Sequence, residues 1–529
     1  MEKNKLFINK IFSGKWNPLI VIAISGFLLY GRALFFDFTY LDDNVLILGH
    51  QYFLADVFNV FQSFLTQVFN IFGDSGFYYR PILTISFIFD YQFSLVNPFM
   101  YHFTNVILHI SASCLLFVFL TKLNYRKPIS LVFAMIFLVH PVLTQAVAWI
   151  PGRNDSLLAV FILSAFIFLI KYLRDEKPKN FVWALIFFAT ALFTKESAVF
   201  ALPIMFFYVY FVYKKDKTVL ISKGLSFFAV SGVLIIFWAI IRDLVLNNPG
   251  AMTVFEMLES IYLNFPATVQ FFGKIFLPFN LSVLPIIQDT TFVYGIIATL
   301  FLAFLILITK SKRVNFILFG FFWFFAFLLP SFIRPNTELV ADFIEHRLYV
   351  PIIGIFIILL ETDFIKNIDF KKRKTLIIVG GLILVFGSIT FVHSKNFMNK
   401  TSFWENAVKN SPHYPLAHRN LGAMRYLDGD MNGAEEESKK ALELNPEEVM
   451  AHNNLGLIYA KQNKVKEAEI EYKKELEVNP FYDDAYYNLG LLYLKEERYD
   501  EALDSWKKTL EINPNHSDAL NILYSLNQQ

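Results

Sequence analysis

Two adjacent carboxylates follow the first long apolar stretch of the sequence. Asp42 and Asp43 lie in the segment Phe-Asp-Phe-Thr-Tyr-Leu-Asp-Asp-Asn that starts at Phe36. A carboxylate can take the proton from a hydroxyl group as that hydroxyl attacks, and a neighbouring acid can raise its pKa into a useful range. The alternative is an acidic cluster at a helix end that only contacts water and headgroups. We therefore predict a general base at Asp42 or Asp43, and the residue types do not distinguish the two.

Basic residues border three other apolar stretches, at Arg153, Lys195 and Arg347. The planar guanidinium of arginine suits a phosphate, and ionisable groups near a membrane boundary are costly unless they are paired or functional. Arg153 has either Asp155 or a phosphate as its partner. Lys195 has either Glu196 or a lipid phosphate. Both alternatives remain open at this point.

Two further segments contain candidate supporting residues. Arg80 follows two tyrosines, and these three side chains are able to stack on a sugar or to anchor the chain at the membrane interface. Glu345 and His346 directly precede Arg347. A second histidine at ligand spacing is missing from the sequence around His346, so we predict no metal ligand there.

The composition places most of the chain in a membrane. The sequence has 529 residues, of which 55% are hydrophobic and only 17% are charged, which is rare for a soluble protein of this length. A net charge of +2 gives no reason to expect nucleic acid as a partner. The single cysteine, Cys114, lies in an apolar run and is expected to pack there.

The elements that must position these side chains are membrane-spanning helices. A helix needs about 20 apolar residues to cross a bilayer, or slightly fewer within a bundle. Eleven stretches qualify: 18–36, 101–120, 129–148, 155–171, 180–194, 197–213, 224–242, 292–309, 315–333, 348–361 and 375–393. The apolar stretches Pro81–Leu95 and Ile261–Pro278 would reverse the charge pattern downstream if they crossed, so we assign them to interfacial or re-entrant helices.

The distribution of Lys and Arg then predicts the orientation. Eleven spans place every strongly basic loop in the cytoplasm, together with the lysine-rich N-terminus at residues 3–15. The C-terminal part is then periplasmic or luminal. On that same side lie the loops 37–80, 149–154, 243–291 and 334–347, which hold most of the candidate residues.

The C-terminal part contains a repeat. Asn-Leu-Gly recurs at residues 420, 454 and 488, and Asn-Pro at 445, 479 and 513, both with a spacing of 34 residues. This spacing is typical of tetratricopeptide repeats, in which each helical pair packs against its neighbours. The repeats form either a surface that binds a peptide or protein, which we favour, or a folded spacer.

Taken in order, these motifs resemble the C-type glycosyltransferase superfamily. The resemblance is to its protein O-mannosyltransferase-like branch, and within that branch to transmembrane proteins with tetratricopeptide repeats. It runs through the acidic pair, a Tyr-Arg-Pro stretch, a His-Pro to Gly-Arg-x-Asp segment, a Lys-Glu turn and a Glu-x-Arg-x-Tyr-x-Pro segment before the repeats. One departure is Gln145, where related sequences often carry Glu, so we assign that position no acid-base role.

The resemblance implies an inverting enzyme that moves a sugar from a polyprenyl phosphate carrier to a hydroxyl group of a protein or glycan. It implies that Asp42 or Asp43 is the base and that Arg153, Lys195 and Arg347 lie near the carrier phosphate. Arg80, Asp155, Glu196, Glu345 and His346 are supporting residues. No cofactor is expected besides this lipid-linked donor. The alternative is a non-catalytic membrane anchor for a repeat scaffold.

We therefore predict an all-α chain in three parts. Residues 1–394 form the membrane domain, residues 395–414 a connector with a degenerate repeat helix, and residues 415–529 the tetratricopeptide repeats with a capping helix.

Overall fold

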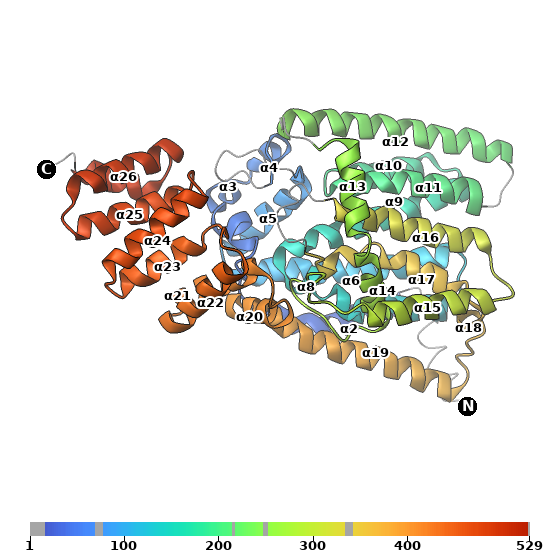
Figure 1. Cartoon of the computed structure of the whole chain (residues 1–529). Coiled ribbons are helices and arrows are strands. Elements are labelled where there is room, and N and C mark those ends of the chain that lie inside the picture. The colour runs from blue at the N-terminus through green and yellow to red at the C-terminus, as the bar shows by residue number, and fades with distance from the viewer. Residues whose placement is uncertain (1–15, 69–77, 214–216, 247–251, 334–341, 527–529) are drawn as a thin grey trace. The chain divides into compact units, whose positions relative to one another are not determined.

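The computed structural model describes residues 16–68, 78–213, 217–246, 252–333 and 342–526. The lysines predicted to mark a cytoplasmic N-terminus lie outside these residues. The described residues form helices and no regular strand, with one isolated antiparallel bridge between Ile286 and Asp342. The chain divides between Asn399 and Lys400 into two compact units, here called the membrane unit and the repeat unit (Figure 1). This boundary lies five residues beyond the predicted end of the membrane domain.

The long helices of the membrane unit coincide with the predicted spans. Six helices of the described chain, some extended by a short 3₁₀ turn, are long and apolar enough to cross a bilayer. They are α2 (Asn17–Tyr30), α6 (Pro98–Lys122), α9 (Arg153–Asp175), α12 (Lys217–Leu246), α16 (Val314–Leu328) and α19 (Arg373–His393). A seventh candidate is α7 (Lys127–Val139) together with Pro141–Ala148, which contains α8 (Gln145–Ala148) and is bent by 53° from α7.

Shorter apolar helices occupy the four remaining predicted spans. These are α10 (Pro178–Leu192), α11 (Ala201–Phe207), α15 (Val293–Ile308) and α17 (Ile352–Leu360). The chain is therefore a multi-pass membrane protein, and the number of eleven crossings remains a prediction. Short helices in the connecting segments are α3 (Gln51–Ala55), α4 (Asn59–Gln62) and α18 (Asp363–Lys366).

The two stretches that we predicted at the membrane interface are helical. The first is α5 (Pro81–Ser94), and the second contains α13 (Val254–Asn264) and α14 (Ala267–Phe276). Helix α14 packs directly on α15, because a Cβ atom on Gly295 would lie only 1.9 Å from the Val269 carbonyl oxygen. Their interfacial position remains a prediction.

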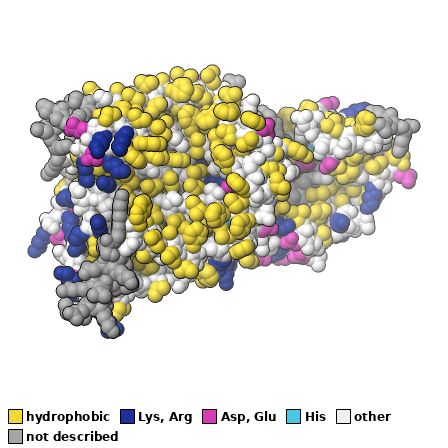
Figure 2. All heavy atoms as spheres, turned by 180° about the vertical axis from the view of Figure 1, so that it is seen from behind, with side chains coloured by type: hydrophobic (Ala, Val, Ile, Leu, Met, Phe, Trp, Pro, Cys, Tyr) yellow, Lys and Arg dark blue, Asp and Glu magenta, His cyan; other side chains and the backbone are white. Residues whose placement is uncertain are grey.

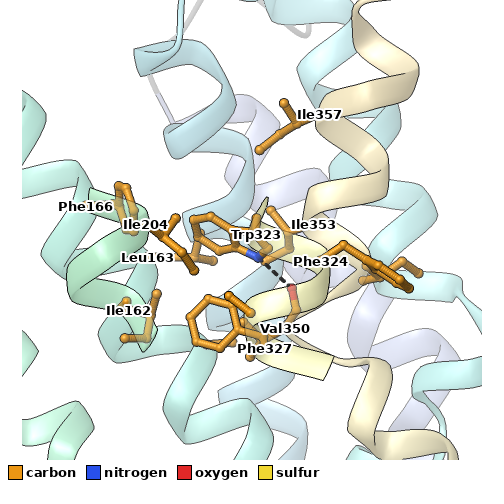
Figure 3. Close-up of a cluster of buried hydrophobic side chains, with 14 of the residues drawn as sticks. Ile162, Leu163, Phe166, Ile204, Trp323, Phe324, Phe327, Val350, Ile353 and Ile357 are labelled. Carbon is orange, nitrogen blue, oxygen red and sulfur yellow. Dashed lines mark hydrogen bonds between the residues drawn. The ribbon is translucent and has the colours of Figure 1, made fainter. Parts of the chain in front are cut away.

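The core of the membrane unit is aromatic and closely packed (Figure 3). Trp323 on α16 is fully buried against Phe166 of α9, and its indole Nε1 donates a hydrogen bond to the Val350 carbonyl at 2.9 Å. Helices α16 and α17 approach each other at Gly320 and Gly354, where an added Cβ would meet backbone atoms of the other helix at 2.6 and 2.3 Å. Small residues permit such contacts between membrane helices. This packing fixes the segment before α17, which includes Glu345, His346 and Arg347.

The repeat unit consists of successive helical pairs. Its helices are α20 (Lys400–Asn410), α21 (Pro415–Leu427), α22 (Met431–Leu444), α23 (Ala451–Lys461), α24 (Val465–Val478), α25 (Asp483–Lys495), α26 (Tyr499–Ile512) and α27 (Ser517–Leu526). The glycines of the Asn-Leu-Gly motifs lie where the two helices of a pair touch. An added Cβ would come within 2.7 Å of Ser438 at Gly422, and within 2.5 Å of Tyr472 at Gly456 and of Trp506 at Gly490. The predicted all-α fold, with its repeat architecture, is confirmed.

Candidate active site

The two adjacent acids have different surroundings. Both oxygens of Asp43 are used within its own loop, because Oδ2 accepts hydrogen bonds from the Thr39 amide at 2.7 Å and the Thr39 hydroxyl at 3.1 Å. Its Oδ1 accepts from the Asn44 amide at 3.1 Å, and the side chain is fully buried. Asp42 is only partly buried. Asp43 therefore holds the loop in shape, while Asp42 is accessible for chemistry.

The surroundings of Asp42 shift its pKa toward neutral pH. Burial raises the pKa of Asp42 to about 7, with further contributions from the negative charges of Asp43 and Asp342, while the positive charge of Arg80 acts in the opposite direction. A carboxyl group with a pKa near the working pH is suited to general base catalysis.

Arg80 connects the first loop to the hairpin between α10 and α11. Its Nε donates to Glu196 Oε2 at 3.1 Å, and the amide of Tyr79 donates to Glu196 Oε1, also at 3.1 Å. The guanidinium lies over the ring of Tyr78, 4.2 Å from its centroid. Glu196 therefore fixes the cation that acts on Asp42.

Lys195 precedes Glu196 in the sequence, and its side chain contacts the start of α9. Its Nζ donates to Asp155 Oδ1 at 2.7 Å, and it lies 3.4 Å from Asn154 Oδ1. Burial lowers the pKa of Lys195, and the charge of Asp155 opposes this shift. Lys195 thus pairs with Asp155 rather than with its sequence neighbour Glu196.

His346 and Arg347 complete the cluster from the segment before α17. His346 Nε2 lies 3.6 Å from Asp155 Oδ2. Burial and the positive charges of Lys195, Arg347 and Arg80 lower the pKa of His346, which favours a neutral ring. Arg347 donates to the carbonyl and to Oδ1 of Asp342 at 2.8 and 2.9 Å, and Asp342 is one of the charges that act on Asp42.

Most of the predicted site residues therefore meet in one place, here called the charged cluster. It contains Asp42, Arg80, Asp155, Lys195, Glu196, Asp342, His346 and Arg347. Asp342 was not predicted, although its charge within a loop rich in candidates was a usable signal. Side chains from four separate loops converge here, as expected for an active site rather than for isolated surface ion pairs.

The burial and the ion-pair partner of Arg153 differ from those that we predicted. Its side chain is fully buried, and it forms an ion pair with Asp90 of α5 rather than with Asp155. The guanidinium also donates to Asn105 Oδ1 at 2.7 Å and to the Tyr101 carbonyl at 2.6 Å. It has no exposed surface for a phosphate in this structure, so we correct its predicted role to one of joining α5, α6 and α9.

Glu345 is fully buried and is not part of the charged cluster. Its Oε1 accepts hydrogen bonds from Lys274 Nζ at 2.8 Å and from the Ser282 amide at 2.9 Å, and Oε2 lies 3.5 Å from His393 Nε2. Burial alone would raise the pKa of Glu345, but Lys274 and His393 hold it below its usual value. Glu345 thus anchors the segment that carries His346 and Arg347. Lys274 was not predicted.

Among the residues that the structure describes, no group of three metal-ligating side chains comes together. The expectation that His346 is not a metal ligand remains a prediction.

Comparisons with known proteins find a family match that covers part of the membrane unit. A family model described as dolichyl-phosphate-mannose-protein mannosyltransferase matches residues 85–242, and tetratricopeptide repeat models match residues 438–470 and 483–516. The first match includes Asp155, Lys195 and Glu196 of the charged cluster.

Several curated proteins are similar to parts of this chain. The Xenopus laevis protein O-mannosyl-transferase tmtc2 is 32% identical over 41% of this chain and 27% of its own length. Mouse TMTC3 is 33% identical over 25% of this chain and 15% of its own length. The Caenorhabditis elegans protein O-mannosyl-transferase F38B6.6 is 26% identical over 69% of this chain and 54% of its own length. The alignments thus leave large parts of these relatives uncovered.

With a mannosyltransferase family match in the membrane unit and tetratricopeptide repeat matches in the repeat unit, the chain is similar to proteins named protein O-mannosyl-transferases, as the resemblance of its ordered motifs predicted.

Proposed function

We propose that this protein is a membrane glycosyltransferase that moves a sugar from a polyprenyl phosphate to a hydroxyl group on the non-cytoplasmic face. The observation that carries the proposal is the placement of Asp42. It is a partly accessible carboxyl group with a pKa of about 7, and the charge of Arg80 acts on it within a cluster of further cations. The match to a mannosyltransferase family supports the same reaction class.

In the proposed reaction, the acceptor hydroxyl oxygen attacks the anomeric carbon of the sugar from the side opposite the phosphate. A carbon–oxygen bond to the acceptor forms as the carbon–oxygen bond to the phosphate breaks, which inverts the anomeric centre. The hydroxyl proton moves to the Asp42 carboxylate, and the bonding electrons leave with the polyprenyl phosphate. Cations near the phosphate stabilise the negative charge that develops on it.

Lys195, Arg80 and Arg347 are the proposed donor-phosphate residues. Each has a carboxylate partner in the structure, so a phosphate would share or replace that partner. Asp155 Oδ2 and His346 Nδ1 are buried without a hydrogen-bond partner among the described residues. Buried polar atoms are normally satisfied, so these two atoms beside Lys195 are consistent with a site that a polar ligand completes.

The proposed acceptor is a protein Ser or Thr or a glycan, and the repeat unit is proposed to bind the acceptor or a partner protein. A non-catalytic anchor for the repeats is the alternative function. An anchor gives no reason to hold Asp42 accessible beside cations while Asp43 is tied to the backbone.

The first test separates the two acids. Full-length protein in lipid nanodiscs is assayed with polyprenyl-phosphate mannose, glucose and galactose. Asp42→Asn is expected to lower turnover by roughly 10²-fold or more while the protein stays folded, because the base is lost. Asp43→Asn is expected to lower thermal stability as well, because its oxygens bind the loop backbone. Near-normal turnover in Asp42→Asn would refute the assignment.

The second test concerns the donor. Lys195→Ala and Arg347→Ala are expected to raise the KM for the lipid-linked donor or to lower kcat, depending on whether each contact strengthens in the transition state. Deletion of residues 415–529 is expected to affect mainly a protein acceptor. Lys371→Ala, an exposed cation outside the cluster, is the matched control. If the point variants changed only the KM for the acceptor, this division of roles would be wrong.

A further inference from the structure

A polar cavity lies at the end of the membrane helices opposite the charged cluster. Its volume is about 740 Å³, and the residues that line it include Arg174, Lys312, Arg313, Tyr208, Tyr213 and Phe316. These residues come from the end of α9, the end of the apolar segment that contains α11, the loop between α15 and α16, and the first turn of α16. Figure 2 shows Lys and Arg side chains gathered at one end of the membrane unit, with hydrophobic side chains along its length.

This cavity is separate from the charged cluster. Asp155 and Arg174 are 19 residues apart on the continuous helix α9, which corresponds to about 28 Å along the helix axis. The hydrocarbon core of a bilayer is about 30 Å thick. The cavity and the charged cluster therefore lie at opposite boundaries of the membrane, and a donor phosphate bound at Lys195 cannot reach the cavity.

The cations in the cavity retain capacity for an anion. Arg174 donates to two neutral acceptors, the Lys122 carbonyl at 2.6 Å and Asn124 Oδ1 at 3.1 Å, and it also forms a side-chain hydrogen bond with Tyr213. Lys312 Nζ lies 3.3 Å from the Ile306 carbonyl and is otherwise exposed. Arg313 pairs with Glu361, which is not among the lining residues. Of the described residues that line the cavity, none is acidic.

A smaller cavity of about 200 Å³ extends this basic surface. It shares Asn124 and Arg313 with the larger cavity and adds Arg126 and Lys366. Arg126 also donates to neutral acceptors, the carbonyls of Lys366 at 2.7 Å and Ile368 at 3.1 Å. Positive charge thus continues across the loops at this boundary.

We propose that the larger cavity binds a phosphate-bearing anion at the membrane boundary predicted to face the cytoplasm. Arg174 and Lys312 supply the charge, and Tyr208 and Tyr213 supply hydroxyl groups at headgroup level. The phosphate group belongs either to an anionic lipid of that leaflet or to a soluble phosphate compound. Basic residues at the cytoplasmic surface generally attract anionic lipids. This cavity in addition provides a binding site of defined shape.

The test uses the full-length protein in nanodiscs of phosphatidylcholine with about one fifth phosphatidic acid. Native mass spectrometry after mild release counts the phosphatidic acid that remains bound. Wild-type protein is expected to retain it, and Lys312→Gln is expected to retain about fivefold less, because a cation near a phosphate has been removed. Arg174→Gln is a second variant, and since its main-chain contacts also support the fold, thermal stability is measured for both. Lys371→Gln makes the same charge change at an exposed position outside the cavity.

In a parallel experiment, inorganic phosphate or glycerol phosphate is added to the protein in nanodiscs of pure phosphatidylcholine, and the unfolding temperature of the protein is measured. Retained phosphatidic acid without a response to soluble phosphate identifies a lipid site. A response to soluble phosphate that Lys312→Gln removes identifies a site for a soluble anion. Equal lipid retention in wild type, Lys312→Gln and Lys371→Gln, with no response to soluble phosphate, would overturn the proposal.

Discussion

At the scale of single residues, hydrogen bonds to the backbone distinguish two identical side chains. Asp43 accepts from the Thr39 amide and from its neighbour Asn44, so its carboxylate holds the loop that follows α2 and its 3₁₀ turn. Asp42 remains partly accessible and lies close enough to Arg80 and Asp342 for their charges to change its pKa. The pair is thus one structural acid and one acid that is available for proton transfer.

The first prediction here concerns pH. Asp42 must be deprotonated to act as a base, so kcat/KM is expected to fall about tenfold per pH unit below about 7 and to level off above it. The neighbouring charges predict opposite changes in the midpoint. Asp342→Asn removes a negative charge and should lower the midpoint, whereas Arg80→Gln removes a positive charge and should raise it.

Measurement of kcat/KM from pH 5 to pH 9 for wild type and both variants checks this. Shifts in the same direction for the two variants would contradict the assignment of Asp42, because a general loss of structure does not depend on the sign of the charge removed. Lys371→Gln serves as the control for a remote charge change.

Part of the candidate site was predictable from single residues, and part was not. Charges at the ends of apolar stretches pointed to Lys195, Asp155, His346 and Arg347, because such charges are costly unless they are paired or functional. The same principle applies to Asp90 and Lys274, although both lie within stretches assigned to the interface. The partner of Arg153 could not be derived, since Asp90 is 63 residues away in sequence and only the packing of α5 against α6 and α9 brings it close.

At the scale of helices, the repeat unit was predictable from the regular spacing of its sequence motifs. A spacing of 34 residues repeats the same helix pair, so one set of residue types, with glycine where two helices touch, recurs in each copy. The membrane unit lacks such a repeat. Its helices were located from hydropathy, but the bend of 53° after α7 and the direct contact between Gly320 and Gly354 depend on three-dimensional packing.

This packing gives a prediction for the repeat unit. Gly456→Val places a branched side chain where a Cβ alone would lie 2.5 Å from the buried ring of Tyr472. We expect the repeat unit to unfold about 5 °C lower or more, since overpacking of this kind costs roughly 1–3 kcal/mol. Lys461→Val introduces the same side chain at an exposed position of α23 and is the control.

Thermal proteolysis of the full chain, followed by mass spectrometry of peptides from residues 400–526, measures this unfolding separately from that of the membrane unit. An unchanged temperature for Gly456→Val, or an equal decrease for Lys461→Val, would show that the helices of this pair are not in close contact.

At the scale of the whole membrane unit, two groups of loops lie at opposite ends of the same helices. Loops that carry Asp42, Arg80, Lys195 and Arg347 contribute to the charged cluster, and each of them was predicted to be non-cytoplasmic. Loops that carry Asn124, Arg174, Arg313 and Lys366 line the two cavities, and each was predicted to be cytoplasmic. An alternating set of crossings produces this separation, whereas an additional crossing at α5 would place loops from both groups at one end.

The course of α19 extends the argument to the C-terminal part. The helix begins at Arg373, in the basic segment after α18, and at its other end His393 lies 3.5 Å from Glu345, next to the charged cluster. The chain thus leaves the membrane unit at the end that holds the candidate active site.

The last prediction follows from this arrangement and from the preference of basic loops for the cytoplasm. A reporter enzyme that is active only outside the cytoplasm is expected to be active when fused after Gln529 and inactive when the chain is cut and fused after Lys310. Fusion after Ser197, beyond the hairpin that carries Lys195, should also be active, and it tests the charged cluster directly. An inactive C-terminal fusion, with an active fusion at Lys310, would place the charged cluster in the cytoplasm. The cavity lined by Arg174 and Lys312 would then face the compartment in which the donor was proposed to bind, and the assignment of the two ends would have to be exchanged.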